Sequence, residues 1–482
     1  MATPGKSSFI VVANRLPVDR VVDAQGNVGW KRSPGGLVTA LHPVLKSENG
    51  TWVGWAGSVD ESPEPFDLDG MHLSPVSLDA EELQFYYEGF SNATLWPLYH
   101  DAVEQPSFHR HWWKAYERVN IRFAERVAAE AAPGGLVWVQ DYQLQLVPAL
   151  LRRLRPDLKI GFFLHIPFPP VELFMQIPRR LDILNGLLGA DVVGFQRPMA
   201  AQNFLRLTRH LLNLRPHGNT VVTDDGRSVR AAAYPISIDT VSVEATADTE
   251  KVAARAKELR AELGDPRSIL LGVDRLDYTK GIEHRLKAYR ELLTDGWLSI
   301  PETTLVQVAT PSRERVEHYR ALRSTVEREV GRINGDFGKV GLPAVHYLHQ
   351  SYDHTELAAL YRIADVMMVT PLRDGMNLVA KEYVASRTDN DGALVLSEFA
   401  GAAAELKQAF AVNPHDLDEV KLVLMRALQT PREDRRRRMR SMRRHLRTHD
   451  VKHWAGSFLT ALGAPEAATA YNSDKLRESR PC

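Results

Sequence analysis

Cysteine is almost absent from this sequence, which has a single one at its last position, Cys482. A single cysteine excludes an intramolecular disulfide and a cysteine-based zinc site. Long apolar runs are absent too. No stretch of about 18 apolar residues occurs, and the first apolar run is too short for the core of a signal peptide. We therefore expect a cytoplasmic protein that neither crosses nor binds a membrane.

Net charge is also missing, because 60 basic and 60 acidic side chains cancel. This balance argues against nucleic acid as a partner. The arginine-rich run at residues 431–447 could suggest nucleic-acid binding. Its interleaved Met439, Met442 and Leu446 instead fit the buried stripe of a helix whose basic face is solvated. We predict no nucleic-acid partner and assign no role to the arginines of residues 432–447.

Several motifs that mark cofactor or catalytic sites are absent. The sequence has no Walker-type G-x-x-x-x-G-K-[ST], no G-x-G-x-x-G and no G-x-S-x-G nucleophile elbow. The histidines of HRHWW (109–113) have no carboxylate at ligand spacing, and the Asp-x-Asp pairs at 67–69 and 416–418 follow no convincing strand. We therefore expect no cofactor and no metal site.

The sequence does contain a series of short apolar runs that predict buried strands. They are residues 9–15, 135–141, 159–167 and 191–196, followed by residues 268–278, 304–310, 345–350, 365–371 and 393–398. Longer stretches with helical spacing separate them. Continuous apolar strands alternating with helices indicate parallel sheets that are covered on both faces. The predicted fold class is α/β, with two doubly wound, Rossmann-like domains.

A charged, alanine-rich stretch near residues 240–262 separates the two series of strands. We predict an N-terminal domain over residues 1–240 and a C-terminal domain over residues 241–450. A helix over residues 451–465 is expected to return to the N-terminal domain. The small and polar residues 466–482 are expected to form a flexible tail.

Charged or titratable side chains follow most of the predicted strands. Ligands of open α/β sheets bind beyond the carboxyl ends of the strands, so these positions are candidate site residues. They are Arg15, Asp141, His165, Arg275, Arg313 and the pair Arg373–Asp374. One such residue is usually only solvated, but a series across two domains favours a ligand cleft between facing sheets.

The segment VTPLRDGMNLVAKEY (369–383) predicts a strand that is followed by a helix. The N–H groups of Asn377, Leu378 and Val379 could hold a phosphate at the start of that helix. Glu382 lies about one turn further, where a carboxylate can accept hydrogen bonds from ribose hydroxyls. The alternative is an ordinary helix that Asp374 or Asn377 caps.

Two further loops are candidates for ligand binding. Arg275 and Lys280 follow a predicted strand in VDRLDYTKG and could neutralise a diphosphate, although such cations are often only solvated. Gly35 and Gly36 directly precede a predicted helix, where their missing Cβ atoms would let a ligand approach the backbone. The alternative for the two glycines is a simple entry turn.

Several segments occur in the order that one enzyme family shows. They are ANR (13–15), FYYEGFSNATLWP (85–97), WVQDYQLQLVP (138–148), GFFLHIPFPP (161–170), RLDYTKG (275–281), ATPSRERV (309–316) and TPLRDGMNLVAKEYV (370–384). Over nearly its whole length the chain resembles the trehalose-6-phosphate synthases, which belong to glycosyltransferase family 20. The resemblance implies a retaining enzyme of the GT-B fold, whose two Rossmann-like domains have parallel sheets facing a central cleft.

The resemblance implies a donor site for a nucleoside diphosphate glucose, mostly in the C-terminal domain. Arg275 and Lys280 match the pair that grips the diphosphate, and Asp374 matches the carboxylate that holds glucose hydroxyls. The segment 377–382 matches the part that contacts phosphate and ribose. Tyr352 lies where relatives place an aromatic residue near the base. In the N-terminal domain, Gly36, next to Gly35, and His165 match groups that lie against the transferred sugar.

The resemblance also implies a pocket for glucose 6-phosphate. It is matched by Arg15, Tyr87, Trp96 and Asp141, with Arg313 reaching over from the C-terminal domain. The implied reaction transfers glucose to the anomeric hydroxyl of glucose 6-phosphate with retention and gives trehalose 6-phosphate. In it, the cations stabilise charge on the leaving diphosphate, His165 orients the sugar and Asp141 positions the acceptor.

Some points stay open at the level of sequence. Gln140 and Gln143 stand where many relatives carry histidines, and the stretch between Arg15 and Gly35 is comparatively long. The base of the donor could be uracil, adenine or guanine, and Arg373 has no assigned role. Other readings are a related transferase with another phosphorylated acceptor, such as glycerol 3-phosphate, and a non-catalytic sugar-phosphate sensor. We expect a homo-oligomer, with a tetramer as one candidate.

Overall fold

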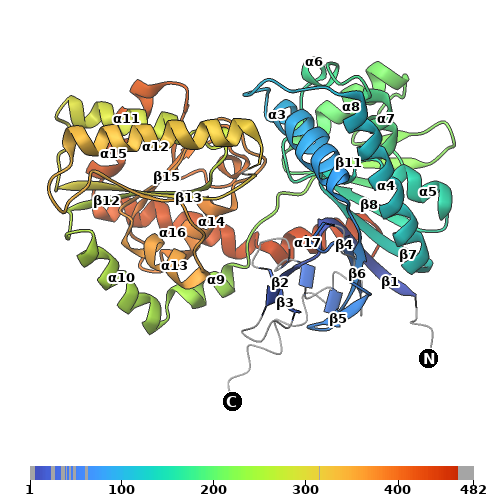
Figure 1. Cartoon of the computed structure of the whole chain (residues 1–482), viewed down its shortest axis with the longest axis horizontal. Helices are drawn as coiled ribbons and strands as arrows, with labels where there is room; N and C mark the ends of the chain where they lie inside the picture. The colour runs from blue at the N-terminus through green and yellow to red at the C-terminus, as the bar shows by residue number, and fades with distance from the viewer. Residues whose placement is uncertain are drawn as a thin grey trace. The chain divides into compact units, whose positions relative to one another are not determined.

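The computed structural model describes residues 6–22, 28–33, 38, 41–42, 45–46, 50–59, 63–313 and 315–464. The chain divides into two compact units (Figure 1). Unit 1 consists of Met1–Ile236 and Val451–Cys482, and unit 2 consists of Ser237–Asp450. The boundary at Ile236 lies four residues before the predicted one at residue 240. The predicted tail, residues 466–482, and the candidates Gly35 and Gly36 lie outside the described residues.

Unit 1 is built on a sheet in which the described residues form nine strands, in the order β10-β11-β9-β8-β7-β1-β4-β6-β5. Pairing is parallel from β11 to β6, and only the edge strands β10 and β5 pair antiparallel. The strands are β1 (Ser7–Arg15), β4 (Thr51–Trp55), β5 (Phe66–Leu68), β6 (Met71–Val76), β7 (Ala131–Gln140), β8 (Lys159–Phe163), β9 (Val192–Phe195), β10 (Thr220–Val222) and β11 (Ser228–Ala233). A separate antiparallel pair joins β2 (Val18–Val22) and β3 (Val28–Arg32).

The strand β6 is not among the predicted strands, and it contains a proline. Pro75 removes a backbone donor, which argues against an interior strand. The structure resolves this conflict, since β5 pairs only with residues 71–73 of β6 and leaves Pro75 beyond that pairing. Pro75 therefore has β4 on one side only.

The helices of unit 1 follow its strands along the chain. They are α2 (Ala80–Glu82), the π-type helix η1 (Leu83–Leu95), α3 (Trp96–Tyr99), α4 (Arg110–Glu130), the short η2 (Tyr142–Leu144), α5 (Val147–Leu154), α6 (Val171–Phe174), α7 (Arg180–Leu187), α8 (Pro198–Leu212) and α17 (Val451–Ala461). The last of these packs on the sheet through aromatic rings. Phe458 stacks on Trp138 with ring centroids 4.4 Å apart, and Trp454 lies 5.1 Å from Trp138. Helix α17 thus belongs to unit 1 although its sequence follows unit 2.

Unit 2 has a parallel sheet of six strands among its described residues, in the order β14-β13-β12-β15-β16-β17. The strands are β12 (Ser268–Arg275), β13 (Thr303–Thr310), β14 (Val345–Leu348), β15 (Val366–Val369), β16 (Ala393–Ser397) and β17 (Phe410–Val412). Each of the first five overlaps a predicted strand. The order reverses direction between β12 and β15, which is the topological switch point of a doubly wound sheet.

Helices surround the sheet of unit 2 in Figure 1. They are α9 (Thr240–Ala247), α10 (Glu250–Glu262), the short η3 (Tyr278–Lys280), α11 (Ile282–Thr294), α12 (Glu317–Phe337), α13 (His354–Ile363), α14 (Leu378–Ser386), the short η4 (Gly401–Ala404), α15 (Leu417–Gln429) and α16 (Arg432–Thr448). One hydrophobic core cluster of the unit consists of apolar residues of the strands together with the inward faces of α11, α12 and α15.

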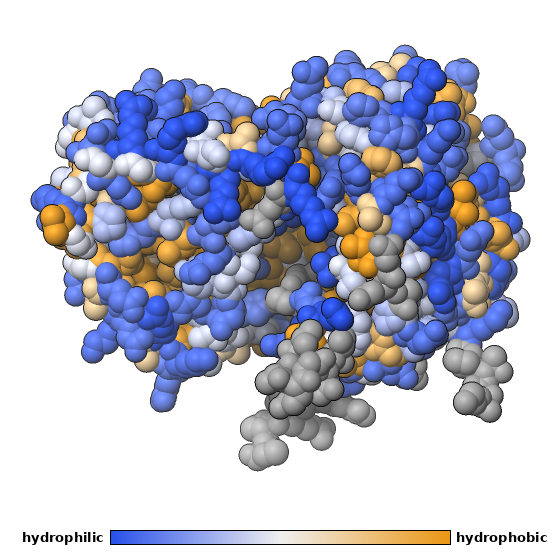
Figure 2. Space-filling view, in the orientation of Figure 1, coloured by the Kyte–Doolittle hydropathy of each residue, from blue (hydrophilic) through white to orange (hydrophobic). Residues whose placement is uncertain are grey.

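The surface is mostly hydrophilic on the face that Figure 2 shows, with apolar residues in small scattered groups. This is the distribution expected when helices cover a sheet and turn their polar faces outward. In the part of the chain that the structure describes, no helix is both long and apolar enough to cross a membrane.

Candidate functional site

A cavity of about 530 Å³ lies at the carboxyl ends of β1, β7 and β8 in unit 1. Four predicted site residues line it together, namely Arg15, Tyr87, Asp141 and His165. Its other lining residues are Ala13, Asn14, Leu16, Pro17, Asp19, Ser33, Val38, Trp52, Gln140 and Gln143. We call this space the unit 1 cavity. Trp96, also predicted for this site, is not among the lining residues.

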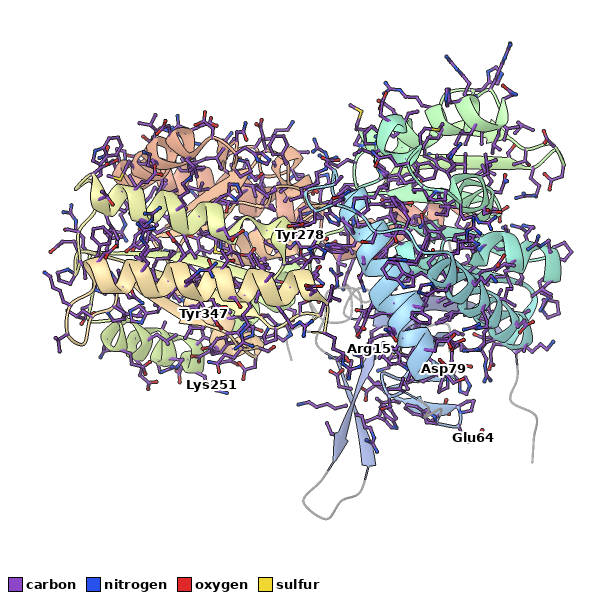
Figure 3. All side chains as sticks on the ribbon, turned by 45° about the horizontal axis from the view of Figure 1, so that its top comes forward. Arg15, Glu64, Asp79, Lys251, Tyr278 and Tyr347 are labelled. Atoms are coloured by element: carbon purple, nitrogen blue, oxygen red, sulfur yellow. The ribbon has the colours of Figure 1, made fainter. Side chains whose placement is uncertain are left out.

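Arg15 is the last residue of β1 and its side chain is exposed (Figure 3). Its guanidinium lies 3.7 Å from the Asp19 carboxylate and 5.6 Å from the ring centroid of Trp55. A guanidinium that rests on an aromatic ring keeps its planar edge available for a bidentate anion. Arg15 therefore presents a cationic edge at the unit 1 cavity.

Asp141 occupies the turn between β7 and η2 in a conformation that a non-glycine residue rarely adopts. Its φ is 73° and its ψ is 172°. The carboxylate oxygen Oδ1 accepts a hydrogen bond of 3.1 Å from the backbone N–H of His165, and the backbone N–H of Asp141 donates to the Phe163 carbonyl. Strained backbone of this kind gathers at functional sites, where surrounding contacts hold it in place. The strain is invisible in the sequence.

His165 is packed between polar and aromatic neighbours after β8. Its Nε2 lies 2.9 Å from the Gln140 side-chain oxygen, and its ring centroid lies 4.7 Å from that of Phe163. Burial lowers the pKa of His165 to about 3, because the charged imidazolium would lose its hydration. His165 is therefore neutral at physiological pH, which suits a hydrogen-bonding role.

The aromatic residues of the predicted pocket lie at two depths. Tyr87, on η1, lines the unit 1 cavity. Trp96 is buried, with its ring centroid 4.2 Å from that of His100 and 5.7 Å from that of Tyr142. Asn92 connects the two layers, since it donates to the Tyr87 carbonyl and accepts a hydrogen bond of 2.7 Å from the Tyr142 hydroxyl. Trp96 thus packs against Tyr142 in the segment that follows β7.

In unit 2, the candidate site lies where β12 and β15 end. The Lys280 ammonium lies 2.5 Å from the Asp374 carboxylate, and both side chains are largely buried. The Asn377 side chain donates to the same carboxylate at 3.1 Å. We call Lys280, Asp374 and Asn377 the unit 2 cluster. The structure therefore brings together residues from the segments RLDYTKG and TPLRDGMN, which lie about 90 residues apart in the sequence.

Helix α14 starts at the unit 2 cluster. Asn377 has a φ of 75°, and its side-chain oxygen accepts a hydrogen bond of 3.1 Å from the Ala380 N–H, so it caps the helix. The capping alternative considered for the sequence is thus correct for Asn377. It does not exclude a ligand, because the first-turn N–H groups of Leu378 and Val379 still point out from the helix start.

The two loops of the unit 2 cluster are held together by backbone contacts. The Leu372 N–H donates to the Thr279 carbonyl at 2.7 Å. Gly281 has a φ of 64°, and a Cβ atom there would lie only 2.2 Å from the Thr370 carbonyl oxygen. Only glycine permits this close approach.

A buried ion pair lies beneath these loops. Arg285, which is 0% exposed, pairs with Asp274 at 2.7 Å and donates to the Gln307 oxygen at 2.7 Å. It also donates to the Thr370 hydroxyl at 3.1 Å. Asp274 precedes Arg275 and Thr370 follows β15, so one guanidinium ties together the ends of two strands that carry predicted site residues.

Two further predicted cations of unit 2, Arg275 and Arg313, lie near Asp277. Arg275 ends β12 with an exposed side chain. Arg313 has a φ of 48° and donates to the Asp277 carboxylate at 3.2 Å and to the Tyr319 hydroxyl. Burial opposes ionisation of Asp277, but Arg313, Arg275 and Lys280 outweigh it and hold the pKa of that carboxyl well below its usual range.

Two predicted donor residues lie further along unit 2. Glu382, on α14, accepts a hydrogen bond of 3.2 Å from the Tyr361 hydroxyl. Burial raises the pKa of the Glu382 carboxyl. Tyr352 follows β14, and its hydroxyl accepts a hydrogen bond from the Gln350 side chain.

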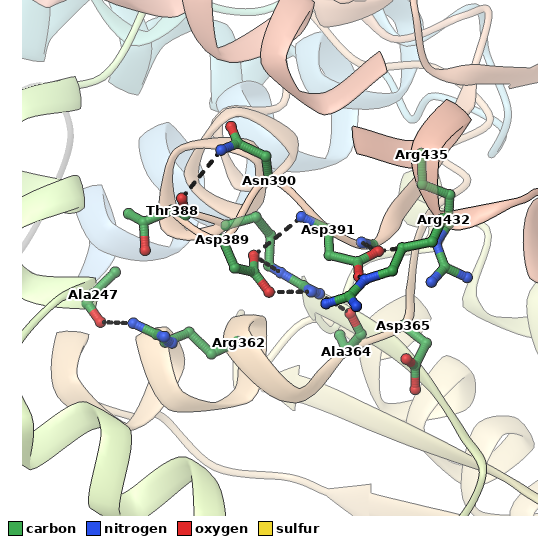
Figure 4. A network of polar contacts seen from close by, with 12 residues as sticks. Ala247, Arg362, Ala364, Asp365, Thr388, Asp389, Asn390, Asp391, Arg432 and Arg435 are labelled. Carbon is green, nitrogen blue, oxygen red and sulfur yellow. Dashed lines mark hydrogen bonds and ion pairs between the residues drawn. The ribbon is translucent and has the colours of Figure 1, made fainter. Parts of the chain in front are cut away.

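The arginine-rich helix α16 is tied to acidic residues of its own unit (Figure 4). Arg432 and Arg435 lie 2.8 and 3.0 Å from the Asp391 carboxylate. Arg443 and Arg447 pair with Glu244 on α9. The predicted apolar stripe is confirmed, since Met439, Met442 and Leu446 are buried. These arginines therefore form ion pairs within unit 2.

No group of three or more His, Cys, Asp or Glu side chains that could hold a metal ion occurs among the described residues. The acidic pairs considered in the sequence have local partners instead. Asp67 accepts from His72 at 2.8 Å, and Asp416 caps α15.

The comparison with protein families identifies the chain. The family model described as glycosyltransferase family 20 matches residues 7–464. The chain belongs to this family. It is 59% identical to the trehalose-6-phosphate synthase of Mycobacterium avium over 473 residues, which cover 96% of each chain.

Solved structures agree with this assignment. A UDP-forming α,α-trehalose-phosphate synthase of Burkholderia xenovorans in complex with glucose 6-phosphate matches with a TM-score of 0.86 and 35% identity, over 95% of this chain and 100% of that chain. An E. coli protein bound with UDP-2-fluoro glucose matches with a TM-score of 0.85 and 35% identity, over 94% of this chain and 99% of that chain. The predicted α/β architecture of the GT-B type, with two Rossmann-like domains, is confirmed.

Proposed function

We propose that this family 20 glycosyltransferase is an α,α-trehalose-6-phosphate synthase. It transfers glucose from a nucleoside diphosphate glucose to the anomeric hydroxyl of glucose 6-phosphate, with retention, and releases trehalose 6-phosphate and the nucleoside diphosphate. The observation that carries the proposal is the unit 1 cavity, in which Arg15, Tyr87, Asp141 and His165 line one space large enough for a hexose phosphate. Relatives that are 59% identical and are named trehalose-6-phosphate synthase support the proposal.

Unit 1 binds the acceptor in this proposal. The exposed guanidinium of Arg15 takes the 6-phosphate, because a planar fork of donors suits a phosphate better than a point charge does. The carboxylate of Asp141 accepts from sugar hydroxyls and fixes the sugar in the cavity. Tyr87 supplies a wall of the cavity, and Trp96 supports that wall.

Unit 2 binds the donor. Arg275 and Lys280 neutralise the diphosphate, assisted by the N–H groups at 377–379, and Asp374 and Glu382 accept from glucose and ribose hydroxyls. Charge builds on the leaving diphosphate during transfer, so cations fixed in advance stabilise the transition state more than the ground state. The Lys280–Asp374 ion pair holds both groups in place before the donor arrives. Tyr352 lies near the base, and Gly35 and Gly36 stay candidates from the sequence alone for contact with the transferred sugar.

The neutral imidazole of His165 orients the transferred sugar by a hydrogen bond. A carboxylate nucleophile is not needed if the departing phosphate accepts the proton of the acceptor hydroxyl on the same face as the attack. We further propose that no metal ion is required, that the enzyme is a cytoplasmic homo-oligomer, and that its donor is a uridine, adenosine or guanosine diphosphate glucose.

The test is the release of nucleoside diphosphate from each of the three donors, with glucose 6-phosphate as acceptor and with EDTA present. We expect release that depends on glucose 6-phosphate, together with a product whose proton NMR spectrum shows two α-linked anomeric centres. Release with glycerol 3-phosphate instead would identify a related transferase. Binding of sugar phosphate without release from any donor would identify a sensor.

A further inference from the structure

Gln140 is a buried polar residue in the unit 1 cavity that has no role in the proposed mechanism. It is the last residue of β7, its side chain is 1% exposed, and it lines the cavity beside Asp141 and His165. Buried amides normally have hydrogen-bond partners for both their oxygen and their NH₂ group. The partners of Gln140 are therefore informative.

The two ends of the Gln140 amide differ. The oxygen Oε1 lies 2.9 Å from Nε2 of His165. The nitrogen Nε2 is buried and makes no hydrogen bond with any described residue. An amide nitrogen can donate two hydrogen bonds, and a buried donor without a partner destabilises the state that contains it. A buried donor that lines a ligand cavity and has no partner in the free protein gains its missing hydrogen bond when a ligand places an acceptor beside it.

The contact also bears on the tautomer of the His165 ring. With the amide oriented so that its oxygen faces Nε2, the oxygen can only accept, and this pairing requires the tautomer with the hydrogen on Nε2 and the lone pair on Nδ1. The backbone N–H of His165 is held by Asp141 at 3.1 Å. Gln140 and Asp141 thus fix the ring and the backbone of His165 from adjacent positions.

We propose that the Gln140 side chain positions His165 and donates a hydrogen bond to a hydroxyl of a bound sugar. The inference rests on the proposed function, because that function places sugars in this cavity. An uncharged hydroxyl is the acceptor that suits a neutral amide, whereas the phosphate is served by the Arg15 guanidinium. The hydroxyl comes from the acceptor glucose 6-phosphate or from the transferred glucose.

The experiment compares the wild-type enzyme with Q140M and Q140E. Methionine keeps the volume of glutamine but removes both hydrogen bonds, whereas glutamate keeps the acceptor for His165 and removes the donor. Q202E is the matched control, because Gln202 is exposed on α8 and is not part of the unit 1 cavity. Each enzyme is assayed with monodeoxy analogues of glucose 6-phosphate and, separately, of the donor glucose.

We expect one analogue to lose about tenfold or more in kcat/KM with the wild-type enzyme and with Q202E, which is the effect of one lost hydrogen bond. With Q140M and Q140E, the same analogue and its parent sugar should react with equal kcat/KM. The panel that contains this analogue identifies which sugar makes the contact. Nitrogen NMR of His165 should show the hydrogen on Nε2 in the wild-type enzyme and in Q140E.

The proposal is wrong if every analogue loses the same factor with Q140M as with the wild-type enzyme, because Gln140 would then contact neither sugar. If Q140M does not fold, the wild-type side-chain amide signal of Gln140 decides, since it must shift when a substrate is added. A wild-type enzyme that transfers glucose from none of the donors would remove the proposed function and the hydroxyl contact together. The His165 measurement would still report the ring state in that case.

Discussion

The candidate sites of the two units differ in where their charges lie, since the ion pair at the unit 1 cavity is exposed and that of the unit 2 cluster is largely buried. The unit 1 cavity contains a neutral histidine, side-chain amides, aromatic rings and two carboxylates, Asp19 and Asp141, with one exposed cation, Arg15, at its edge. The unit 2 cluster contains an ion pair, Lys280–Asp374, which lies above a second buried ion pair, Arg285–Asp274. A site for a sugar needs oriented hydrogen-bond donors and acceptors, whereas a site for a leaving diphosphate needs fixed positive charge. The difference matches the proposed division into acceptor and donor units.

The contrast between the two candidate sites would fail most clearly if Arg275 were not needed for departure of the diphosphate. For R275A we expect kcat to fall about 10³-fold, as when one preorganised group that stabilises transition-state charge is removed. The KM for glucose 6-phosphate should change little. R267A is the control, because Arg267 is an exposed arginine just before the opposite end of β12 and should stay within about twofold of the wild-type enzyme. A raised acceptor KM as the only effect of R275A would contradict the assignment.

The buried pair Arg285–Asp274 tests whether the charged design of unit 2 is also structural. R285M leaves the Asp274 carboxylate buried without its partner, which should lower the free energy of unfolding by about 3–5 kcal/mol. The double variant R285M/D274N removes both charges and should be less destabilised than R285M alone. Urea unfolding followed by circular dichroism measures both. Equal losses for the single and the double variant would show that the two charges are not coupled.

The same contrast explains how much the sequence could predict. In unit 2, the strand ends carry contiguous motifs, so RLDYTKG and TPLRDGMN indicated residues that the fold then joined through Lys280 and Asp374. In unit 1, Arg15, Asp141 and His165 follow strands and were found in the same way, and the resemblance added Tyr87. In the sequence, Gln140 was noted only because many relatives carry a histidine at its position.

What the sequence could not show are properties that arise only from folding. The positive φ values of Asp141, Arg313 and Asn377 depend on tertiary contacts that no local pattern encodes. The unsatisfied amide nitrogen of Gln140 depends on how the folded chain packs around it. The ion pair between Arg285 and Asp274 joins two residues that look ordinary in the sequence. Trp96 was predicted for the glucose 6-phosphate pocket but does not line the unit 1 cavity, because it packs with its ring centroid 5.7 Å from that of Tyr142.

Arg15 tests the proposed acceptor site of unit 1, where its exposed guanidinium is assigned to the phosphate. R15K keeps the charge but loses the planar fork of donors, so we expect the KM for glucose 6-phosphate to rise about tenfold while the KM for the donor is unchanged. R153K is the control, since Arg153 is exposed on α5 and is not part of the cavity. If R15K weakened the donor instead, Arg15 would belong to the diphosphate site.

Glu382 gives the smallest expected effect and tests whether unit 2 tolerates a charge that burial disfavours. Burial raises the pKa of the Glu382 carboxyl above its ordinary value of 4.5. The folded state therefore favours the protonated form, so this group's contribution to stability is complete below about pH 4.5 and is lost as the pH rises through the higher folded pKa. Glutamine mimics the protonated form and still accepts from the Tyr361 hydroxyl.

E382Q should consequently raise Tm by about 1–2 °C at pH 7 and leave it unchanged at pH 4. The same variant should raise the KM for the donor, because an amide accepts more weakly from ribose hydroxyls than a carboxylate does. Differential scanning calorimetry at the two pH values and donor titration at pH 7 measure both effects. A gain in Tm with an unchanged donor KM would place Glu382 outside the donor site, and a loss in Tm at pH 7 would show that its charge is stabilised after all. Either result would sharpen the contrast, since it would separate the charges that unit 2 needs for the diphosphate from those it carries only for its fold.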